Sequence, residues 1–120
     1  MKSKNLIDES IKLQLEAKAL GLDWIEVDKI IGKIREETDE LEEAIGTENK
    51  VHIKEELGDL FFSLISLSRH LNIDMDALNK SANDKFKHRL DKIKAEMDKR
   101  NIEYAEPLEM IDIWKSIKNK

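Results

Sequence analysis

The sequence predicts an all-α protein: an antiparallel helical bundle of four main helices followed by a short C-terminal helix. Aromatic residues make up only 5% of the 120 residues, with four Gly and one Pro, which favours helices over sheets. Apolar residues recur at helical spacing over long segments, and the short loops between them favour antiparallel neighbours. The length is close to the commonest domain size, so we expect one domain over residues 1–120.

Capping residues delimit the first two predicted helices. The first helix is expected over about residues 6–20 and ends at Gly21, a residue suited to the left-handed position after a helix. Asp23 is predicted to cap the second helix, with Glu26 three residues later completing a variant of the capping box. This second helix is expected to stop at Gly46.

Similar signals delimit the remaining helices. A third helix is predicted over about residues 51–71, ending near Asn72. Asp74 can cap a fourth helix that runs to about Arg100. Pro107 suits the first position of the short terminal helix.

The third predicted helix is apolar almost all round between Leu60 and Leu67. Such a helix is buried on more than one side. In so small a domain the simplest source of the extra cover is a second copy, so we expect a homodimer or homotetramer. The main apolar stripe consists of Ile53, Leu57, Leu60, Phe61, Leu64 and Leu71.

Composition excludes several classes of protein. Hydrophobic residues make up 40%, too many for a disordered chain, although 39% of residues are charged. The net charge of −5 argues against a binder of nucleic acid polymers but permits a phosphorylated ligand held through metal ions. Without cysteine there is no disulfide or zinc–thiolate site. The N-terminal stretch lacks a signal-peptide core and no apolar run is long enough to span a membrane, which predicts a soluble, cytoplasmic protein without a membrane partner.

Two pairs of acids share the same helical spacing. Glu37 lies at the edge of the apolar stripe of the second helix with Glu40 one turn further, and Glu56 and Asp59 repeat this spacing on the third helix. An antiparallel hairpin brings the two pairs to a similar height. Four facing carboxylates repel one another unless cations lie between them, and an oxygen-only donor set suits Mg²⁺ or Mn²⁺.

The alternative is a solvated, acidic helix surface. An i, i+3 pair of acids is common on charged helices, and Lys33 and Arg35 are near enough in sequence to form ordinary salt bridges. Periodicity leaves both interpretations open.

Several blocks of the sequence resemble one family. "EETDE" at 36–40 and "ELGD" at 56–59 resemble the EExxE…ExxD signature of the MazG nucleotide pyrophosphohydrolases, in a superfamily of all-α enzymes with the dimeric dUTPases and phosphoribosyl-ATP pyrophosphohydrolase. The resemblance to the C-terminal catalytic half of MazG covers nearly the whole chain from about Leu13. It includes, in the same order, "GLDW", "LSRHLNID", "ANDKFKHRL" and "IWKSIK".

The resemblance implies an enzyme, a hydrolase acting on phosphoric anhydride bonds. It would convert (d)NTPs to (d)NMPs and pyrophosphate with Mg²⁺, for which Mn²⁺ can substitute, as a housekeeper of the nucleotide pool. Glu37, Glu40, Glu56 and Asp59 match the catalytic metal ligands, and Glu36 is an additional candidate.

The resemblance also implies substrate-binding residues. Lys85 and Arg89 match a lysine and an arginine that contact substrate phosphates, and Trp114 matches a tryptophan beside the nucleotide. Asn83 is a further candidate, for reading the sugar or base. The residues alone favour Lys85 and Arg89 as side chains that cover the edge of the core, and they fit Trp114 equally well as an anchor of the last helix.

Two alternatives remain open at this point. One is a narrower enzyme, a dUTPase-like or modified-nucleotide pyrophosphatase, because the loops and first helix carry no readable specificity motif. The other is a non-catalytic helical interaction module whose acids are surface residues.

Overall fold

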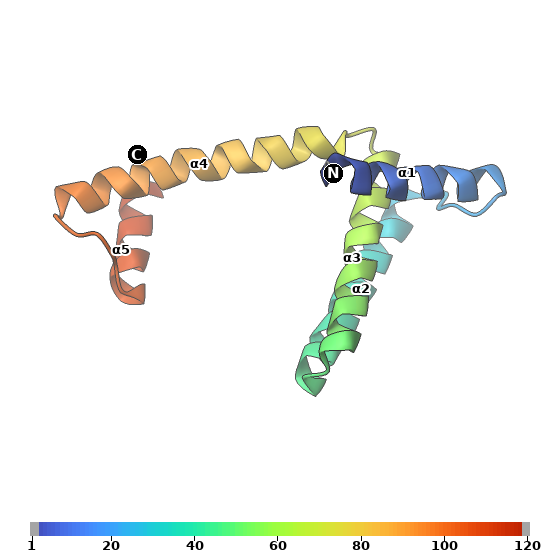
Figure 1. Ribbon diagram of the computed structural model, residues 1–120, viewed down its shortest axis with the longest axis horizontal. Helices are drawn as coiled ribbons and strands as arrows, with labels where there is room; N and C mark the ends of the chain where they lie inside the picture. Colours follow the sequence, from blue (N-terminus) through green and yellow to red (C-terminus); the bar gives the residue numbers. More distant parts are fainter. Residues whose placement is uncertain (1–2, 119–120) are drawn as a thin grey trace. The chain divides into compact units, whose positions relative to one another are not determined.

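The computed structural model describes residues 3–118, with side chains from Ile7 onward. Over this range it consists of helices joined by loops, without strands, which confirms the all-α class (Figure 1). The chain divides into two compact units, one up to Ala77 and one from Leu78 onward, and each is described by itself. The helices are α1 (Ser3–Ala19), α2 (Val27–Thr47), α3 (Lys50–His70), α4 (Met75–Lys99) and α5 (Pro107–Lys118).

The α2–α3 hairpin is the centre of the first unit, and α1 packs across α3 near the open end of the hairpin (Figure 1). Ile30 and Ala44 of α2 and Ile65 of α3 are almost completely buried. The Asn49 side chain accepts hydrogen bonds from two backbone N–H groups of the first turn of α3. With this cap, only two residues separate the end of α2 from the start of α3. The two helices therefore run antiparallel, as predicted.

The ends of three helices use the same backbone motif. At the end of α1, the N–H of Gly21 donates to the carbonyl of Lys18 and the N–H of Leu22 to that of Ala17, each over 2.9 Å. These are the two hydrogen bonds of a Schellman motif, and Gly21 has the φ of +97° that the motif requires, as predicted. Asn72 and Asn101 occupy the equivalent position after α3 and α4, each with φ of 58°.

The predicted stop of α2 at Gly46 is wrong. Gly46 is helical, and the helix continues to Thr47, whose hydroxyl donates to the carbonyl of Ala44 over 2.6 Å. The left-handed residue that ends α2 is Glu48, with φ of 60°. The glycine is permitted but not required at its position, so its presence alone did not mark the helix end.

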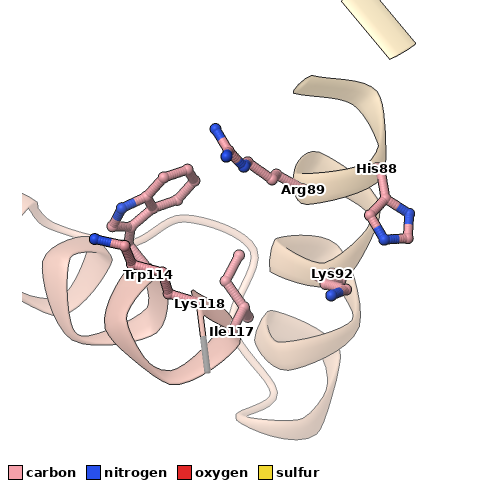
Figure 2. A pocket seen from close by; sticks show the side chains of 6 residues that line it. All are labelled: His88, Arg89, Lys92, Trp114, Ile117 and Lys118. Carbon is pink, nitrogen blue, oxygen red and sulfur yellow. The ribbon is translucent and has the colours of Figure 1, made fainter. Parts of the chain in front are cut away.

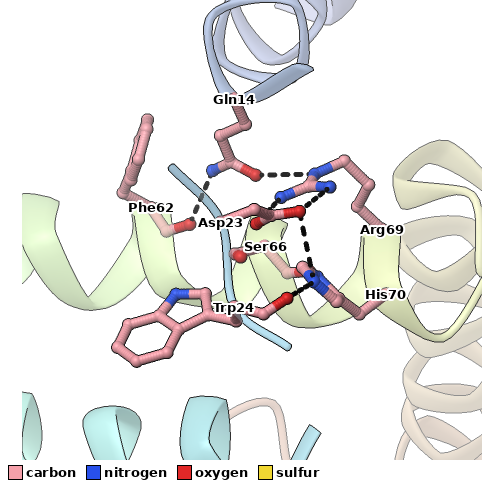
Figure 3. Close-up of polar contacts among 7 residues, drawn as sticks. All are labelled: Gln14, Asp23, Trp24, Phe62, Ser66, Arg69 and His70. Carbon is pink, nitrogen blue, oxygen red and sulfur yellow. Dashed lines mark hydrogen bonds and ion pairs between the residues drawn. The ribbon is translucent and has the colours of Figure 1, made fainter. Parts of the chain in front are cut away.

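The predicted capping role of Asp23 is also wrong. Glu26 occupies the N-cap position of α2 and its side chain makes no capping hydrogen bond. Asp23 instead receives two hydrogen bonds from the guanidinium of Arg69, over 2.8 and 3.1 Å (Figure 3). This charged hydrogen bond lowers the pKa of the Asp23 carboxyl, against the opposing effect of burial.

The Asp23–Arg69 pair is part of a network that joins α1, the α1–α2 loop and α3. Arg69 also donates through Nε to the Gln14 side-chain oxygen, and the Gln14 amide nitrogen donates to the carbonyl of Phe62, each over 3.1 Å. The ring nitrogens of His70 lie 2.9 Å from the carbonyl oxygen of Ser66 and 3.0 Å from that of Trp24. The network fixes the loop before α2 against the last turns of α3.

Part of the apolar stripe of α3 is not covered by the described residues of the first unit. Leu57 and Phe61 are about half exposed (54% and 49%), and Leu64 is 42% exposed. Ser66 and Ser68 are buried instead, and the Ser68 hydroxyl donates to the carbonyl of Ile73 in the loop after the helix. The face of α3 that packs within the first unit is therefore only part of its apolar surface.

In the second unit, α5 packs through Ile113 and Ile117, both buried. Arg100, just after α4, is bound to Glu96 and Asp112, each over 3.0 Å, which raises the pKa of its guanidinium. As predicted, Asp74 caps the start of α4 and Pro107 is the first residue of α5. Over residues 3–118 there is no helix with the length and apolar character needed to cross a membrane.

Candidate active site

Three of the four predicted ligands converge between α2 and α3. Glu37 from α2 and Glu56 and Asp59 from α3 each offer a carboxylate oxygen, and these oxygens lie within 4.8 Å of one another. Glu37 is buried, Glu56 is half-buried and Asp59 is exposed, so the cluster runs from the hairpin interior to solvent. Three carboxylate oxygens this close together could serve as ligands of one metal ion.

Two oxygen atoms of this cluster lack a partner. Oε2 of Glu37 and Oε2 of Glu56 are buried without a hydrogen-bond partner among the described residues. Leaving a charged carboxylate oxygen buried and unpaired is costly, and native structures avoid it unless an ion or water satisfies the atom. With oxygen donors only, the residues fit a hard divalent cation such as Mg²⁺ or Mn²⁺.

Glu40, the fourth predicted ligand, faces the same cluster. Partial loss of hydration raises the pKa of its carboxyl, and the negative charges of Glu37 and Glu56 raise it further. The positive charge of Lys33 acts in the opposite direction. Glu36, the additional candidate, is directed away: its side chain is 64% exposed and it lies 3.6 Å from the Lys33 ammonium group.

Lys33 belongs to the site and was not among the predicted site residues. Its ammonium nitrogen lies 3.0 Å from Oε1 of Glu37, and this bond raises the pKa of Lys33. The ammonium group places one positive charge beside the four carboxylates and holds the Glu37 side chain from one side. The signal in the sequence is the i, i+4 spacing of Lys33 and Glu37, which is equally typical of an ordinary surface ion pair.

In the second unit, two of the four predicted substrate-binding residues come together. The guanidinium carbon of Arg89 lies 5.5 Å from the centre of the Trp114 ring, a cation–π contact (Figure 2). They border a cavity of about 140 Å³ whose other lining residues are His88, Lys92, Ile117 and Lys118. Lys85 and Asn83 are exposed on α4 and do not line this cavity. The basic lining suits an anionic group.

Comparison with known proteins identifies the family to which the chain belongs. A family model described as the MazG nucleotide pyrophosphohydrolase domain matches residues 26–94, more than half of the chain, including all of α2 and α3. The chain belongs to this family. The match confirms the resemblance expected from the acidic motifs, and it places the four carboxylates within the MazG domain.

Two relatives show how far the similarity extends. The chain is 35% identical over 109 residues to the nucleoside triphosphate pyrophosphohydrolase/pyrophosphatase MazG of Thermotoga maritima, an alignment that covers 89% of this chain and 42% of that protein. It is 29% identical over 113 residues to a nucleoside triphosphate pyrophosphohydrolase of Escherichia coli K12, covering 91% of this chain and 43% of that protein. This MazG chain therefore spans less than half the length of the curated relatives it matches.

Proposed function

We propose that this MazG chain is a Mg²⁺-dependent pyrophosphohydrolase that converts (d)NTPs to (d)NMPs and pyrophosphate. The observation that carries the proposal is the convergence of Glu37, Glu56 and Asp59, with two buried carboxylate oxygens that have no partner. A solvated acidic surface, the alternative, gives no reason to bury unpaired carboxylate oxygens. Membership of the family, and the activity in the names of its relatives, support the same reaction.

In the proposed mechanism the acids hold the cation and the attacking water. Glu37, Glu56 and Asp59 would bind Mg²⁺ or Mn²⁺, with Glu40 facing them. When bound, such a cation neutralises triphosphate charge and acidifies a coordinated water. A carboxylate oxygen of the set accepts a proton from the attacking water while the water oxygen forms a bond to phosphorus, and the P–O bond between the α- and β-phosphates breaks, releasing pyrophosphate.

Basic residues of α4 are proposed to bind the phosphates. Arg89 is suited to this role because its guanidinium is held over the Trp114 ring and faces a cavity with a basic lining. Trp114 then orients Arg89 rather than only anchoring α5. Lys85, one turn earlier, is exposed and able to reach an anion, and Asn83 is proposed to contact the sugar or base.

The products distinguish this reaction from others. A panel of ribo- and deoxyribonucleoside triphosphates, incubated with Mg²⁺ and separated by anion-exchange chromatography, should yield monophosphate and pyrophosphate. Diphosphate and orthophosphate would contradict the proposed bond cleavage. Turnover confined to dUTP or to a modified nucleotide would support the narrower enzyme over a housekeeper of the cytoplasmic nucleotide pool.

Mg²⁺ is expected to raise the melting temperature of the protein in the absence of nucleotide. A ligand that binds only the folded state at about one hundred times its Kd stabilises it by about 3 kcal/mol. Differential scanning fluorimetry with Mg²⁺, Mn²⁺ and a matched concentration of NaCl checks this. Glu56→Gln should reduce the increase, whereas Glu43→Gln, at an exposed position of α2, should preserve it. A non-catalytic module predicts no difference between Mg²⁺ and NaCl.

The protein is proposed to form a homodimer or homotetramer. Supporting this, Leu57, Phe61 and Leu64 recur at helical spacing on α3 and remain about half exposed within the first unit. Leu64→Asp is expected to shift the protein toward monomer in analytical ultracentrifugation, because it places a charge in that stripe. Val51→Asp, on the same helix and 72% exposed, is the control that should leave the oligomeric state unchanged. A monomeric wild-type protein would refute the prediction.

A further inference from the structure

A hollow with a mainly apolar lining lies in the first unit between α1, the α1–α2 loop and α3. Its volume is about 410 Å³, within the range of about 300–1,000 Å³ that is typical of small-molecule sites. Leu13, Ala17 and Leu22 form its aliphatic lining, and Trp24 and Phe62 supply two aromatic rings. Figure 3 shows both rings on one side of Asp23, with Arg69 and His70 on the other. Aromatic walls of this kind suit a planar ring that can stack.

The polar groups of this cavity are largely engaged with one another. Both carboxylate oxygens of Asp23 receive hydrogen bonds from Arg69. The Gln14 side chain accepts from Arg69 and donates to the carbonyl of Phe62. The polar side of the cavity is therefore held in place without a ligand. Selection by the cavity should depend on shape and stacking more than on hydrogen bonds to a particular base edge.

The cavity and the acid cluster share one face of α3. Asp59 belongs to the cluster, and Ser63 and Ser66, four and seven residues further along, line the cavity. At about 1.5 Å per residue they lie about 6 and 10 Å from Asp59 along the helix axis, and at about 100° per residue all three fall within about 60° of one another. A sugar with its α-phosphate can bridge such a separation.

The cavity beside Trp114 is less suited to a nucleobase. Its volume is about 140 Å³, below the range typical of small-molecule sites, and Arg89 already stacks over the indole ring. Its basic lining fits phosphate better than an uncharged aromatic ring. Of the two hollows, the one in the first unit has the size and the walls for a base.

We propose that the cavity lined by Trp24 and Phe62 receives the nucleobase of the substrate, while the triphosphate extends along α3 toward Asp59. This inference rests on the proposed pyrophosphohydrolase function and adds where the base binds. Binding in the cavity depends on the shape of the base and on stacking with the aromatic rings. Purine and pyrimidine nucleotides should therefore both bind, with KM values that differ little. Trp24, in the loop before α2, is then a substrate-binding residue.

Ala17→Leu tests the proposal with little risk to the fold. Ala17 lines the cavity from α1, and leucine keeps its high helix propensity while filling part of the space. The substitution should raise KM for ATP and for UTP by about tenfold or more and change kcat by less than about twofold, because it removes binding common to the ground and transition states. Ala19→Leu, at an exposed position of the same helix, is the matched control and should leave KM unchanged.

A second measurement uses base binding without hydrolysis. In a Trp114→Phe variant, Trp24 is the sole tryptophan, so its fluorescence reports on the cavity. Adenosine and uridine should quench this fluorescence in a saturable way, and ribose 5-phosphate, which lacks a base, should not. Adding Ala17→Leu should abolish the quenching, while melting curves verify that the variant is folded.

The outcomes separate this inference from the proposed function. Hydrolysis with an unchanged KM in Ala17→Leu would overturn the base site and leave the pyrophosphohydrolase function standing. Saturable quenching by adenosine and uridine that Ala17→Leu abolishes would support the base site even if no triphosphate were hydrolysed. A change of oligomeric state in Ala17→Leu, with KM unchanged, would assign the cavity to a contact between copies and would also overturn the proposal.

Discussion

Glu56→Gln is expected to abolish pyrophosphate release while leaving the helical fold intact. Glu56 offers one carboxylate oxygen to the cluster with Glu37 and Asp59, and its other oxygen is buried without a partner. Glutamine keeps the size of the side chain but removes the charge that a divalent cation requires. Because a bound cation contributes several kcal/mol of transition-state stabilisation, we expect kcat/KM to fall by about 10³-fold.

In the absence of Mg²⁺, the same substitution should not destabilise the protein. Removing one of several facing carboxylates relieves repulsion, so the melting temperature without Mg²⁺ should stay the same or rise. On one preparation, circular dichroism gives the helical content, thermal melting gives the melting temperature, and a pyrophosphate-release assay gives the activity. Asp59→Asn should behave alike, and Glu43→Gln, which alters an exposed acid on α2, should retain activity. Full activity of Glu56→Gln would refute the assignment, and loss of activity together with a lower melting temperature would indicate a structural role.

The parts of the fold and site that could be predicted from sequence are those encoded by local spacing. Glu37 and Glu40 share a face because they are three residues apart on one helix, and Glu56 and Asp59 do so for the same reason. The two-residue connection between α2 and α3 then brings the pairs together with little freedom. Helix ends marked by residues that tolerate positive φ, such as Gly21 and Asn72, were predictable on the same basis.

The features that could not be predicted depend on partners far apart in the chain. Asp23 has the residue type and position of a helix cap, but Arg69 lies 46 residues later and offers it a stronger, charge-assisted pair of hydrogen bonds. No local pattern distinguishes the two uses. The cavity beside Trp24 is equally inaccessible to periodicity, because its walls come from α1, a loop and α3.

The apolar stripe of α3 shows a further limit of periodicity. Helical spacing separates apolar from polar positions but does not distinguish the apolar residues that pack within the first unit. Ile65, which is not among the residues of the predicted main stripe, is buried within the first unit, whereas Leu57 and Leu64, near the middle of that stripe, are 54% and 42% exposed. Helical spacing therefore predicts which residues are apolar enough to be buried, but it does not predict which surface they pack against.

Arg69→Ala is expected to destabilise the first unit by about 3 kcal/mol, the scale found when one member of a buried ion pair is removed. The Asp23 and Arg69 side chains are only 14% and 13% exposed, so the substitution leaves a largely buried carboxylate without its main partner. It also removes the hydrogen bond to Gln14 that ties α1 to α3. The melting temperature should fall by about 10 °C or more. Arg35→Ala, at an exposed position of α2, is the control and should have little effect.

A double-mutant cycle with Asp23→Ala separates the ion pair from the other contacts of Arg69. If the two residues stabilise the fold together, the double variant should be more stable than the sum of the single effects predicts, by about 1–3 kcal/mol. The pKa of Asp23 is lowered in the folded state, so this coupling is fully present above its unfolded pKa of about 4 and disappears as the pH falls through the lower folded value. Urea unfolding at pH 7 and at about pH 3 should therefore give a large and a reduced coupling energy, respectively. An equal coupling energy at both pH values would show that packing of the arginine stem, rather than its charge, joins α1 and the α1–α2 loop to α3.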